Sequence, residues 1–177
     1  MRQILSLSLP ALCAFALAAC GGGAGPEVSR AVCVLKPTAG SAVQGSVEFV
    51  QEGAGVRIRA TLTGLAPGAH GFHIHEWGDC DCSDGKCTGG HFNPAGAAHA
   101  GRDAKVRHVG DLGNIQAAAD GKGTLDFVDT MVKLTGANSV IGRAITVHAD
   151  ADDNTSQPTG NAGARVAVGV IGIAPPK

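Results

Sequence analysis

The sequence predicts an all-β fold in which eight short antiparallel strands form a sandwich or a barrel. From Arg30 onward, apolar residues alternate with polar ones at a period of two, as in strands that bury one face. Glycine is unusually frequent, at 27 of 177 residues, and recurs in short turn signals between the alternating segments. No segment shows the period of 3.6 residues expected of a long helix. These three observations are typical of all-β sandwiches and barrels.

The alternation is clearest in segment 56–62, whose apolar residues fall on one face and whose Arg57, Arg59 and Thr61 fall on the other. In chain order, the predicted strands are 31–35 (AVCVL), 43–50 (VQGSVEFV), 56–62 (VRIRATL), 72–77 (FHIHEW), 114–118 (NIQAA), 124–128 (TLDFV), 144–148 (AITVH) and 165–171 (RVAVGVI). Turn signals lie between several of them: Glu52-Gly53, Pro67-Gly68, Asp120-Gly121-Lys122-Gly123 and Thr135-Gly136. Two connections, 78–113 and 149–164, are too long for hairpins, and such loops in a compact domain are usually functional.

Charge and hydropathy exclude two broad classes of protein. Lys and Arg number 14 against 15 Asp and Glu, a formal net charge of −1, which argues against a nucleic-acid binder driven by electrostatics. Beyond the N-terminus, no stretch is apolar for the length of a bilayer crossing, which argues against a multi-span membrane protein.

Residues 1–19 are predicted to be a cleaved signal peptide, with Arg2 as the positive start of an apolar stretch. The ending Leu17-Ala18-Ala19-Cys20 resembles the lipobox of bacterial lipoproteins, which implies cleavage before Cys20 and acylation of that cysteine. Residues 20–29 would then form the lipidated cysteine and a flexible tether, and residues 30–177 the single folded domain. We therefore expect an exported protein, located in the periplasm of the cell envelope and lipid-anchored to a membrane.

The seven histidines are the most informative residues. His73 and His75 are two apart on the predicted strand 72–77, so both rings project from one face, about 7 Å apart, while Ile74 points into the core. Alone, such a pair is weak evidence, because many pairs of this kind bind no metal. Five further residues that can bind metal lie in or beside the two long loops: His91, His99, His108, Asp111 and His148. Imidazoles suit copper and zinc, and three imidazoles with a carboxylate can form a tetrahedral zinc site.

Five segments closely resemble the copper-zinc superoxide dismutase family: GFHIHEWGD, GGHFNPAGAAHAG, RHVGDLGNI, IGRAITVHADADD and GNAGARVAVGVIG. The resemblance runs from about residue 31 to 173 and keeps order and spacing. It implies a flattened eight-stranded antiparallel Greek-key barrel, an immunoglobulin-like sandwich with two long functional loops. It also implies copper and zinc side by side outside the barrel, and the dismutation of superoxide to dioxygen and hydrogen peroxide.

The resemblance assigns ligands position by position. It implies that copper is held by His73, His75, His91 and His148, and zinc by His91, His99, His108 and Asp111. His91 would bridge the two ions and deliver a proton to the departing peroxide, while zinc holds and tunes that ring.

Four further residues take roles by the same resemblance. Asp152 would hydrogen-bond one copper ligand and one zinc ligand, which fixes the orientation of both rings. His70 would tie a loop to the barrel through backbone hydrogen bonds. Arg165 would attract and hydrogen-bond the superoxide anion beside copper, and Thr159 would form the opposite wall of the channel.

The cysteines depart from the family pattern. The usual disulfide joins the first long loop to the last strand, but here that strand carries Val168, and the loop carries Cys80, Cys82 and Cys87. In an exported protein we expect a local disulfide to Cys87 from either Cys80 or Cys82. A Cys-x-Cys pair could alternatively bind copper(I) during metal loading. Cys33 is expected to be a buried free thiol.

The second long loop also departs from the family pattern, because it is shorter than in the animal cytosolic enzymes and has no lysine to attract an anion. Long-range steering would then fall to other basic residues, with Lys105, Arg107 and Lys133 as candidates. The sequence allows a homodimer. The alternative function is a non-catalytic relative that buffers or delivers copper or zinc in the cell envelope, and the complete ligand set with Arg165 favours the enzyme.

Overall fold

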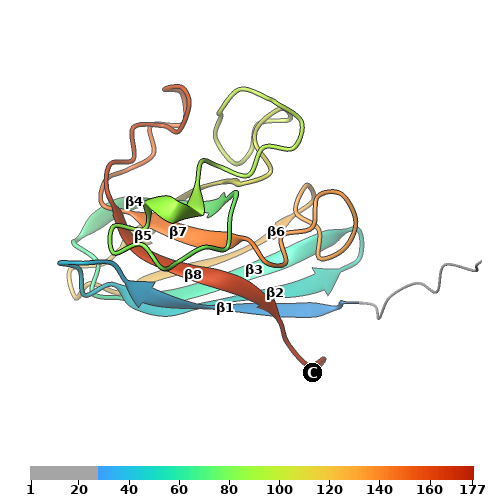
Figure 1. The fold of residues 1–177 in the computed structure, drawn as a ribbon, viewed down its shortest axis with the longest axis horizontal. Coiled ribbons are helices and arrows are strands. Elements are labelled where there is room, and N and C mark those ends of the chain that lie inside the picture. The colour runs from blue at the N-terminus through green and yellow to red at the C-terminus, as the bar shows by residue number, and fades with distance from the viewer. Residues whose placement is uncertain (1–27) are drawn as a thin grey trace, which may run out of the picture.

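All eight expected strands are present in the computed structural model, which describes residues 28–177 (Figure 1). Their bounds are β1 Arg30–Pro37, β2 Gln44–Glu52, β3 Gly55–Thr63, β4 Gly68–His75, β5 Asp111–Ala117, β6 Gly123–Asp129, β7 Ala144–His148 and β8 Arg165–Ile173. A 3-10 helix, η1 Lys86–Thr88, lies in the first long loop and was not expected from the sequence. The predicted signal peptide, Cys20 and most of the tether lie outside the described residues.

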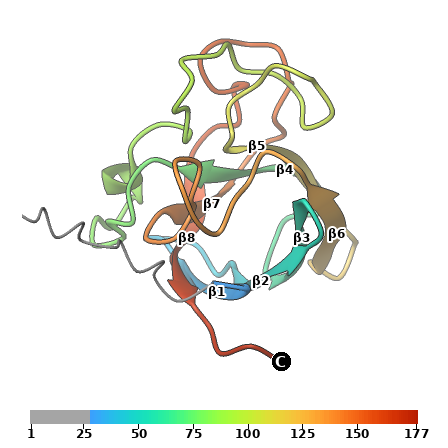
Figure 2. The ribbon, with the colours of Figure 1, turned by 90° about the vertical axis from the view of Figure 1, so that its right-hand side faces the viewer.

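The strands close into an antiparallel barrel in the order β1-β2-β3-β6-β5-β4-β7-β8 (Figure 2). Neighbours in this order are often distant in the chain, because β3 pairs with β6 and β4 with β7. Such crossovers define a Greek key and confirm the predicted fold class. No helix of the described part of the chain is long and apolar enough to cross a membrane.

Alternation along the strands builds the core. In β3, Val56, Ile58, Ala60 and Leu62 are buried, while Arg57 and Arg59 lie outside and pair with Asp126 of β6. The largest fully buried side chains in the described residues include Phe49, Phe72, Ile58, Leu62, Ile74, Leu112, Ile115, Ile145 and Ile171. Cys33 is a buried free thiol, as expected, and burial raises its pKa to about 12.

The prediction for the fourth strand was wrong at both ends. The strand 72–77 begins at Gly68 in the structure, because residues 68–71 pair with β5. It ends at His75, because the N–H groups of Glu76 and Trp77 donate to the carbonyl oxygens of Gly90 and Thr88 in the first long loop instead of to a strand. The loop therefore lies directly against the end of β4.

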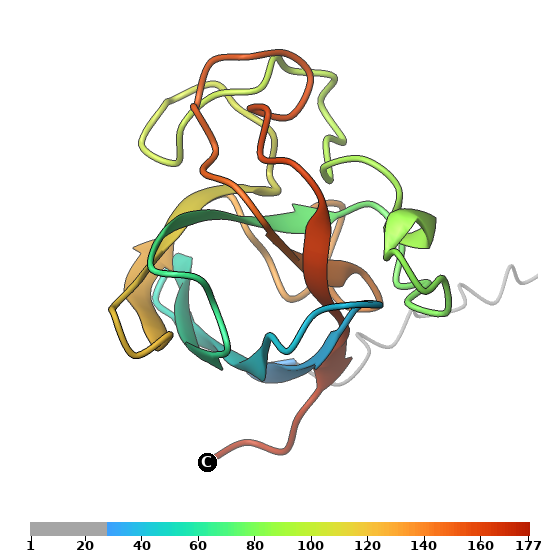
Figure 3. The same cartoon turned by 90° about the vertical axis from the view of Figure 1, so that its left-hand side faces the viewer.

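The two long loops lie side by side over the β4–β5–β7 side of the barrel (Figures 2 and 3). A paired contact joins them: His99 N–H donates to Gln157 Oε1, and Gln157 Nε2 donates to the His99 carbonyl oxygen. The first loop is also fixed to the barrel by a fully buried ion pair between Arg107 and Asp129. These contacts hold the ligand-bearing segments in place.

Candidate metal centre

Four buried histidines point ring nitrogens at one another on the outer side of β4 and β7. His73 and His75 come from β4, and His148 is the last residue of β7. His91 belongs to the first loop, where its backbone forms an isolated antiparallel β-bridge with that of His75. One donor atom from each of these four residues lies within 4.8 Å of the others. The expected strand geometry places the two β4 histidines on this face, while Ile74 between them packs into the core.

Hydrogen bonds fix which nitrogen each ring offers. His75 Nδ1 donates to the Gly89 carbonyl oxygen over 2.9 Å, and His148 Nδ1 donates to that of Gly163 over 3.2 Å. Both Nε2 atoms of these neutral rings then carry lone pairs, yet they lie only 3.2 Å apart. His73 Nδ1 and His91 Nε2 are buried and have no partner among the described residues. Four ring lone pairs thus face one point with no hydrogen-bond donor among the described residues to satisfy all of them, and a bound cation would do so.

A second cluster shares His91 with the first. Asp111 Oδ1 lies 2.8 Å from Nδ1 of His91, 2.9 Å from Nδ1 of His99 and 3.0 Å from Nδ1 of His108. These four donor atoms also lie within 4.8 Å of one another. Three imidazoles and one carboxylate fit the tetrahedral ligand set that zinc prefers. Because His91 gives Nδ1 to this cluster and Nε2 to the first, one imidazole joins both.

The ionisation of these groups suits metal binding. Burial lowers the pKa of His73, His75 and His91, and lowers that of His148 to about 4, so these rings stay neutral at physiological pH. Burial alone would raise the pKa of Asp111, but the hydrogen bonds from His91 and from the Ala100 N–H outweigh it and hold that pKa well below its usual range. In the second cluster, Asp152 and Asp111 outweigh burial and raise the pKa of His99. The first cluster therefore presents neutral rings, and Asp111 adds one carboxylate charge to the second.

Asp152 connects the two clusters from the second loop. Its fully buried carboxylate accepts from His73 Nε2 over 2.8 Å and from His99 Nε2 over 3.0 Å. Its main chain is held by a two-way contact with the Asn114 side chain. These bonds select the tautomers that leave Nδ1 of both rings free for metal.

An open cleft of about 380 Å³ leads to the first cluster. Among the described residues it is lined by Thr38, Ala39, His75, Asp84, Lys86, His148, Thr159, Gly163, Ala164 and Arg165. The structure thus places Arg165 and Thr159 in one cleft with His75 and His148. His70 lies behind the cluster, where its ring nitrogens contact the carbonyl oxygens of His148 (2.9 Å) and Ala66 (2.8 Å).

Comparisons with known proteins agree with this geometry. Residues 43–171 match the family model described as copper/zinc superoxide dismutase (SODC). The chain is 50% identical over 155 residues to a superoxide dismutase [Cu-Zn] of Paramecium bursaria Chlorella virus 1, covering 80% of this chain and 81% of that protein. The crystal structure of the clock protein EA4 matches with a TM-score of 0.76 and 41% identity, covering 82% of this chain and 95% of that one.

The chain belongs to the copper/zinc superoxide dismutase family. Its function is the dismutation of superoxide to dioxygen and hydrogen peroxide, and its cofactors are copper and zinc.

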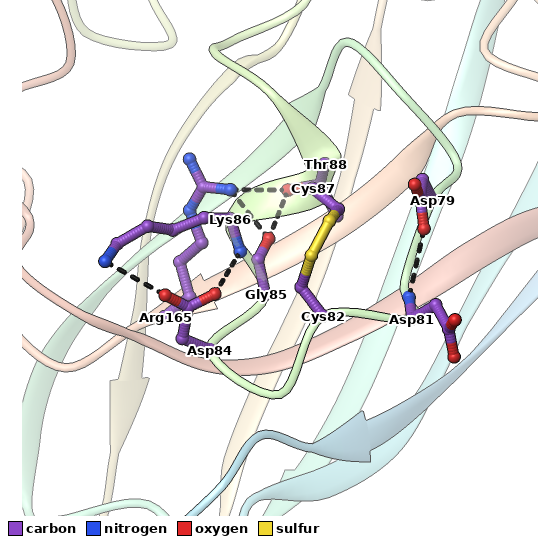
Figure 4. Close-up of a disulfide and its surroundings, with 9 residues drawn as sticks. All are labelled: Asp79, Asp81, Cys82, Asp84, Gly85, Lys86, Cys87, Thr88 and Arg165. Atoms are coloured by element: carbon purple, nitrogen blue, oxygen red, sulfur yellow. Dashed lines mark hydrogen bonds and ion pairs between the residues drawn. A yellow bond between two sulfur atoms is a disulfide. The ribbon is translucent and has the colours of Figure 1, made fainter.

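The disulfide of this superoxide dismutase is local. Cys82 bonds to Cys87, one of the two pairings expected (Figure 4). Cys80 is a free, half-buried thiol. The Cys-x-Cys copper(I) pair is therefore absent from the described structure. The bridge closes a short segment, residues 82–87, which we call the disulfide ring.

The sequence did not reveal what holds Arg165. Its Nη1 donates to the Gly85 carbonyl oxygen (2.7 Å) and to Thr88 Oγ1 (2.9 Å), and its Nη2 donates to the Gly89 carbonyl oxygen (2.6 Å). Gly85 lies inside the disulfide ring and sits against Val168, whose Cγ1 is 2.9 Å from the position a Cβ on Gly85 would take. The ring therefore lies against Val168, the position at which the family resemblance implied a disulfide partner. The local Cys82–Cys87 spacing was the one signal for this ring in the sequence.

Arg107 was wrong as a steering candidate. Its side chain is buried and bonded to Asp129 and to carbonyl oxygens of the first loop, so it cannot attract an anion to the cleft. Lys133 instead donates to the carbonyl oxygens of Ala54 and Thr130, and neither Lys133 nor Lys105 lines the cleft. The cleft lysine is Lys86.

Proposed function

We propose that this enzyme binds copper through His73, His75, His91 and His148 and zinc through His91, His99, His108 and Asp111. The observation that carries the assignment is the opposition of the His75 and His148 Nε2 atoms beside the partnerless His73 Nδ1 and His91 Nε2. Bound copper supplies one-electron chemistry, taking an electron from one superoxide and giving one to the next.

The side chains around the ions perform the remaining tasks. Arg165 presents a guanidinium at the cleft, held by three hydrogen bonds, and binds the superoxide anion through its free N–H groups. His91 Nε2 is the atom that holds a proton between the two half-reactions and delivers it to the peroxide product. Thr159 lines the same cleft as Arg165.

Two measurements test this assignment. Loading both sites of the purified protein with copper(II) should give magnetically coupled ions, because one imidazole joins them; two independent electron paramagnetic resonance spectra would overturn the shared ligand. Arg165→Ala should lower the rate constant for superoxide about tenfold or more while copper content is unchanged. Arg165→Lys keeps the charge, so its rate constant should lie between those of the parent enzyme and Arg165→Ala.

The alternative is a protein that buffers or delivers metal without turnover. A buffer has no use for an anion-binding arginine beside an open copper cleft, and this chain has both. Fast superoxide decay by the metal-loaded protein supports the enzyme, and binding of both metals without decay would support the buffer.

We also propose that the enzyme is an exported lipoprotein of the bacterial type, with residues 1–19 removed, Cys20 acylated, and residues 20–29 as a tether in the periplasm. The fold is compatible with this arrangement: the tether would join β1 at Arg30, whereas Thr38 and Ala39, which follow the other end of β1, line the cleft. The cleft would then lie at the end of β1 away from the tether. Cys20→Ala should move the protein from the membrane pellet to the soluble fraction, and retention in the pellet would overturn the anchor.

A homodimer through the outer face of β1 and β8 is the assembly we propose. Val34 and Val170 are 62% and 44% exposed there, and nearby Trp77 is 57% exposed. Val34 and Val170 line a groove of about 610 Å³ whose lining contains no histidine. Exposed apolar side chains gathered on one face favour association. Val34→Glu should convert a dimer into a monomer in sedimentation velocity, whereas Val106→Glu, a change at an exposed valine elsewhere, should not; a monomeric parent protein would exclude the dimer.

A further inference from the structure

The chain that follows β1 lies against the start of β8, where Arg165 is the first residue. Thr38 is buried there, and its Oγ1 donates to the Arg165 carbonyl oxygen over 2.7 Å. The Thr38 N–H donates to the Val166 carbonyl oxygen over 3.2 Å, just beyond the last pairing of β1 with β8 at Pro37. One residue therefore binds two consecutive carbonyl groups at the start of β8.

Thr38 is held in place by a tight turn. The Ser41 N–H donates to the Thr38 carbonyl oxygen over 3.1 Å and closes residues 38–41, which we call the Thr38 turn. Gly40, the third residue of the turn, has a φ of +80°, a conformation that glycine adopts without strain. Ser41 Oγ also accepts from the Val43 N–H over 3.1 Å. The Thr38 hydroxyl therefore projects from a hydrogen-bonded unit.

The Thr38 turn also contacts the disulfide ring, whose oxygens hold the Arg165 guanidinium. The Ala39 N–H donates to the Ser83 carbonyl oxygen over 2.7 Å. Thr38 Cγ2 lies 3.3 Å from the position that a Cβ on Gly85 would take, and the Gly85 carbonyl oxygen accepts from Arg165 Nη1 (Figure 4). The turn thus contacts the Arg165 main chain directly and the guanidinium through the ring.

These non-covalent contacts matter because the ring has no disulfide to β8 in the described part of the chain. Cys82 and Cys87 close the ring on itself, and β8 carries Val168 where the family resemblance implied a cysteine. The guanidinium can keep one place in the cleft only if the ring and the start of β8 keep their relative positions. The Thr38 turn bonds to both.

We propose, on the basis of the anion-binding role proposed above for Arg165, that Thr38 is a positioning residue for the reaction with superoxide. Its hydroxyl fixes the main chain of Arg165 relative to the ring, and so fixes where the guanidinium meets the anion. Among the described residues no hydrogen bond joins Thr38 to a histidine of either cluster, so the hydroxyl acts on anion binding and not on metal binding.

The test removes the hydroxyl and keeps the shape of the side chain. Thr38→Val retains the branched carbon that packs against Gly85 but leaves the Arg165 carbonyl oxygen without this donor. It should lower the rate constant for superoxide about three- to fivefold, with unchanged copper content. Azide, a small anion with the charge of superoxide, should bind the copper enzyme less tightly by a similar factor, as followed by visible absorption.

Two further variants separate positioning from loop stability. Thr38→Ser keeps the hydroxyl and should keep the rate constant and azide affinity close to those of the parent enzyme. Ser41→Ala is the matched control, because it removes one hydrogen bond from the same turn, the one to the Val43 N–H. It should leave both quantities unchanged, and thermal denaturation compares the stability of all three variants.

A double variant tests whether Thr38 acts through Arg165. In an Arg165→Ala background, Thr38→Val should cause no further loss of rate or azide affinity, because the guanidinium that the hydroxyl positions is gone. A hydroxyl that only stabilised the loop would lower both quantities in either background. That result would overturn the proposal, as would equal losses in Thr38→Val and Ser41→Ala.

The same variants distinguish failure of this role from failure of the role of Arg165. Normal losses in Arg165→Ala together with parent values in Thr38→Val would overturn the positioning role of Thr38 alone. Parent values of rate and azide affinity in Arg165→Ala would overturn the anion-binding role of Arg165, and the role of Thr38 with it.

Discussion

Arg165 and His75 donate hydrogen bonds to the same backbone oxygen, the carbonyl of Gly89. Arg165 Nη2 lies 2.6 Å from it and His75 Nδ1 lies 2.9 Å from it. The anion-binding guanidinium and a copper-site ring are thus oriented by one peptide group. Because His75 Nδ1 carries the proton that it donates to this oxygen, the neutral ring has its lone pair on Nε2. The same oxygen therefore also determines which nitrogen His75 offers to the metal.

The first prediction concerns Gly89 itself. Its φ of +76° and a Trp77 atom 2.6 Å from the position of a Cβ leave no room for a side chain. Gly89→Ala should therefore displace the carbonyl and destabilise the fold by about 1–3 kcal/mol, and it should lower copper affinity and superoxide rate together. Gly90→Ala is the control, because nothing lies within 4 Å of its Cβ position. Thermal denaturation and copper competition measure the two effects; equal behaviour of the two variants would contradict the role of Gly89.

The second prediction separates the disulfide from the free thiol. Replacing Cys82 and Cys87 with Ser opens the ring, which should lower the free energy of unfolding by about 2 kcal/mol. It should also slow turnover without loss of copper, because Gly85 and Gly89 would present their oxygens to Arg165 less firmly. Cys80→Ser should change neither quantity. Mass spectrometry of the unreduced protein checks the pairing, and a Cys80–Cys87 peptide would show that the expected ring is the wrong one.

The strands could be predicted because alternation is a local rule, and the ligand set could be proposed because short motifs resemble those of a known family. The alternation in 56–62 is visible within seven residues of sequence, and the motifs around His73 and His148 are each contained in one short segment. The ends of β4 were wrong because the loop carbonyl oxygens of Thr88 and Gly90 decide where that strand stops.

Interactions between distant segments were not accessible from local patterns. Arg107 looks like any exposed basic residue in the sequence, yet it is buried against Asp129, which is 22 positions away. The support of Arg165 comes from main-chain oxygens, and main-chain oxygens have no signature in a sequence.

The third prediction concerns Asp152, whose carboxylate accepts from His73 of the first cluster and from His99 of the second. An Asn at this position can accept through its single oxygen only, so one of the two rings loses its acceptor and its fixed tautomer. Asp152→Asn should therefore weaken metal binding about 10- to 100-fold, as measured by competition with a chelator. Asp150→Asn removes an exposed carboxylate from the same loop and should leave both affinities unchanged. If both variants lost the same amount of metal affinity, the loss would come from the change in loop charge and not from the hydrogen bonds of Asp152.

The last prediction is the pH dependence of stability in the metal-free protein. Burial lowers the pKa of His148 from 6.5 to about 4, so on acidification the unfolded chain takes up this proton first. The stability contributed by the neutral ring is complete above pH 6.5 and is lost as the pH falls toward 4. One such group gives a slope of about 1.4 kcal/mol per pH unit across that window, and His73, His75 and His91 act in the same direction. Urea denaturation should show that slope reduced in His148→Gln, and an unchanged slope would mean that His148 titrates normally in the folded protein.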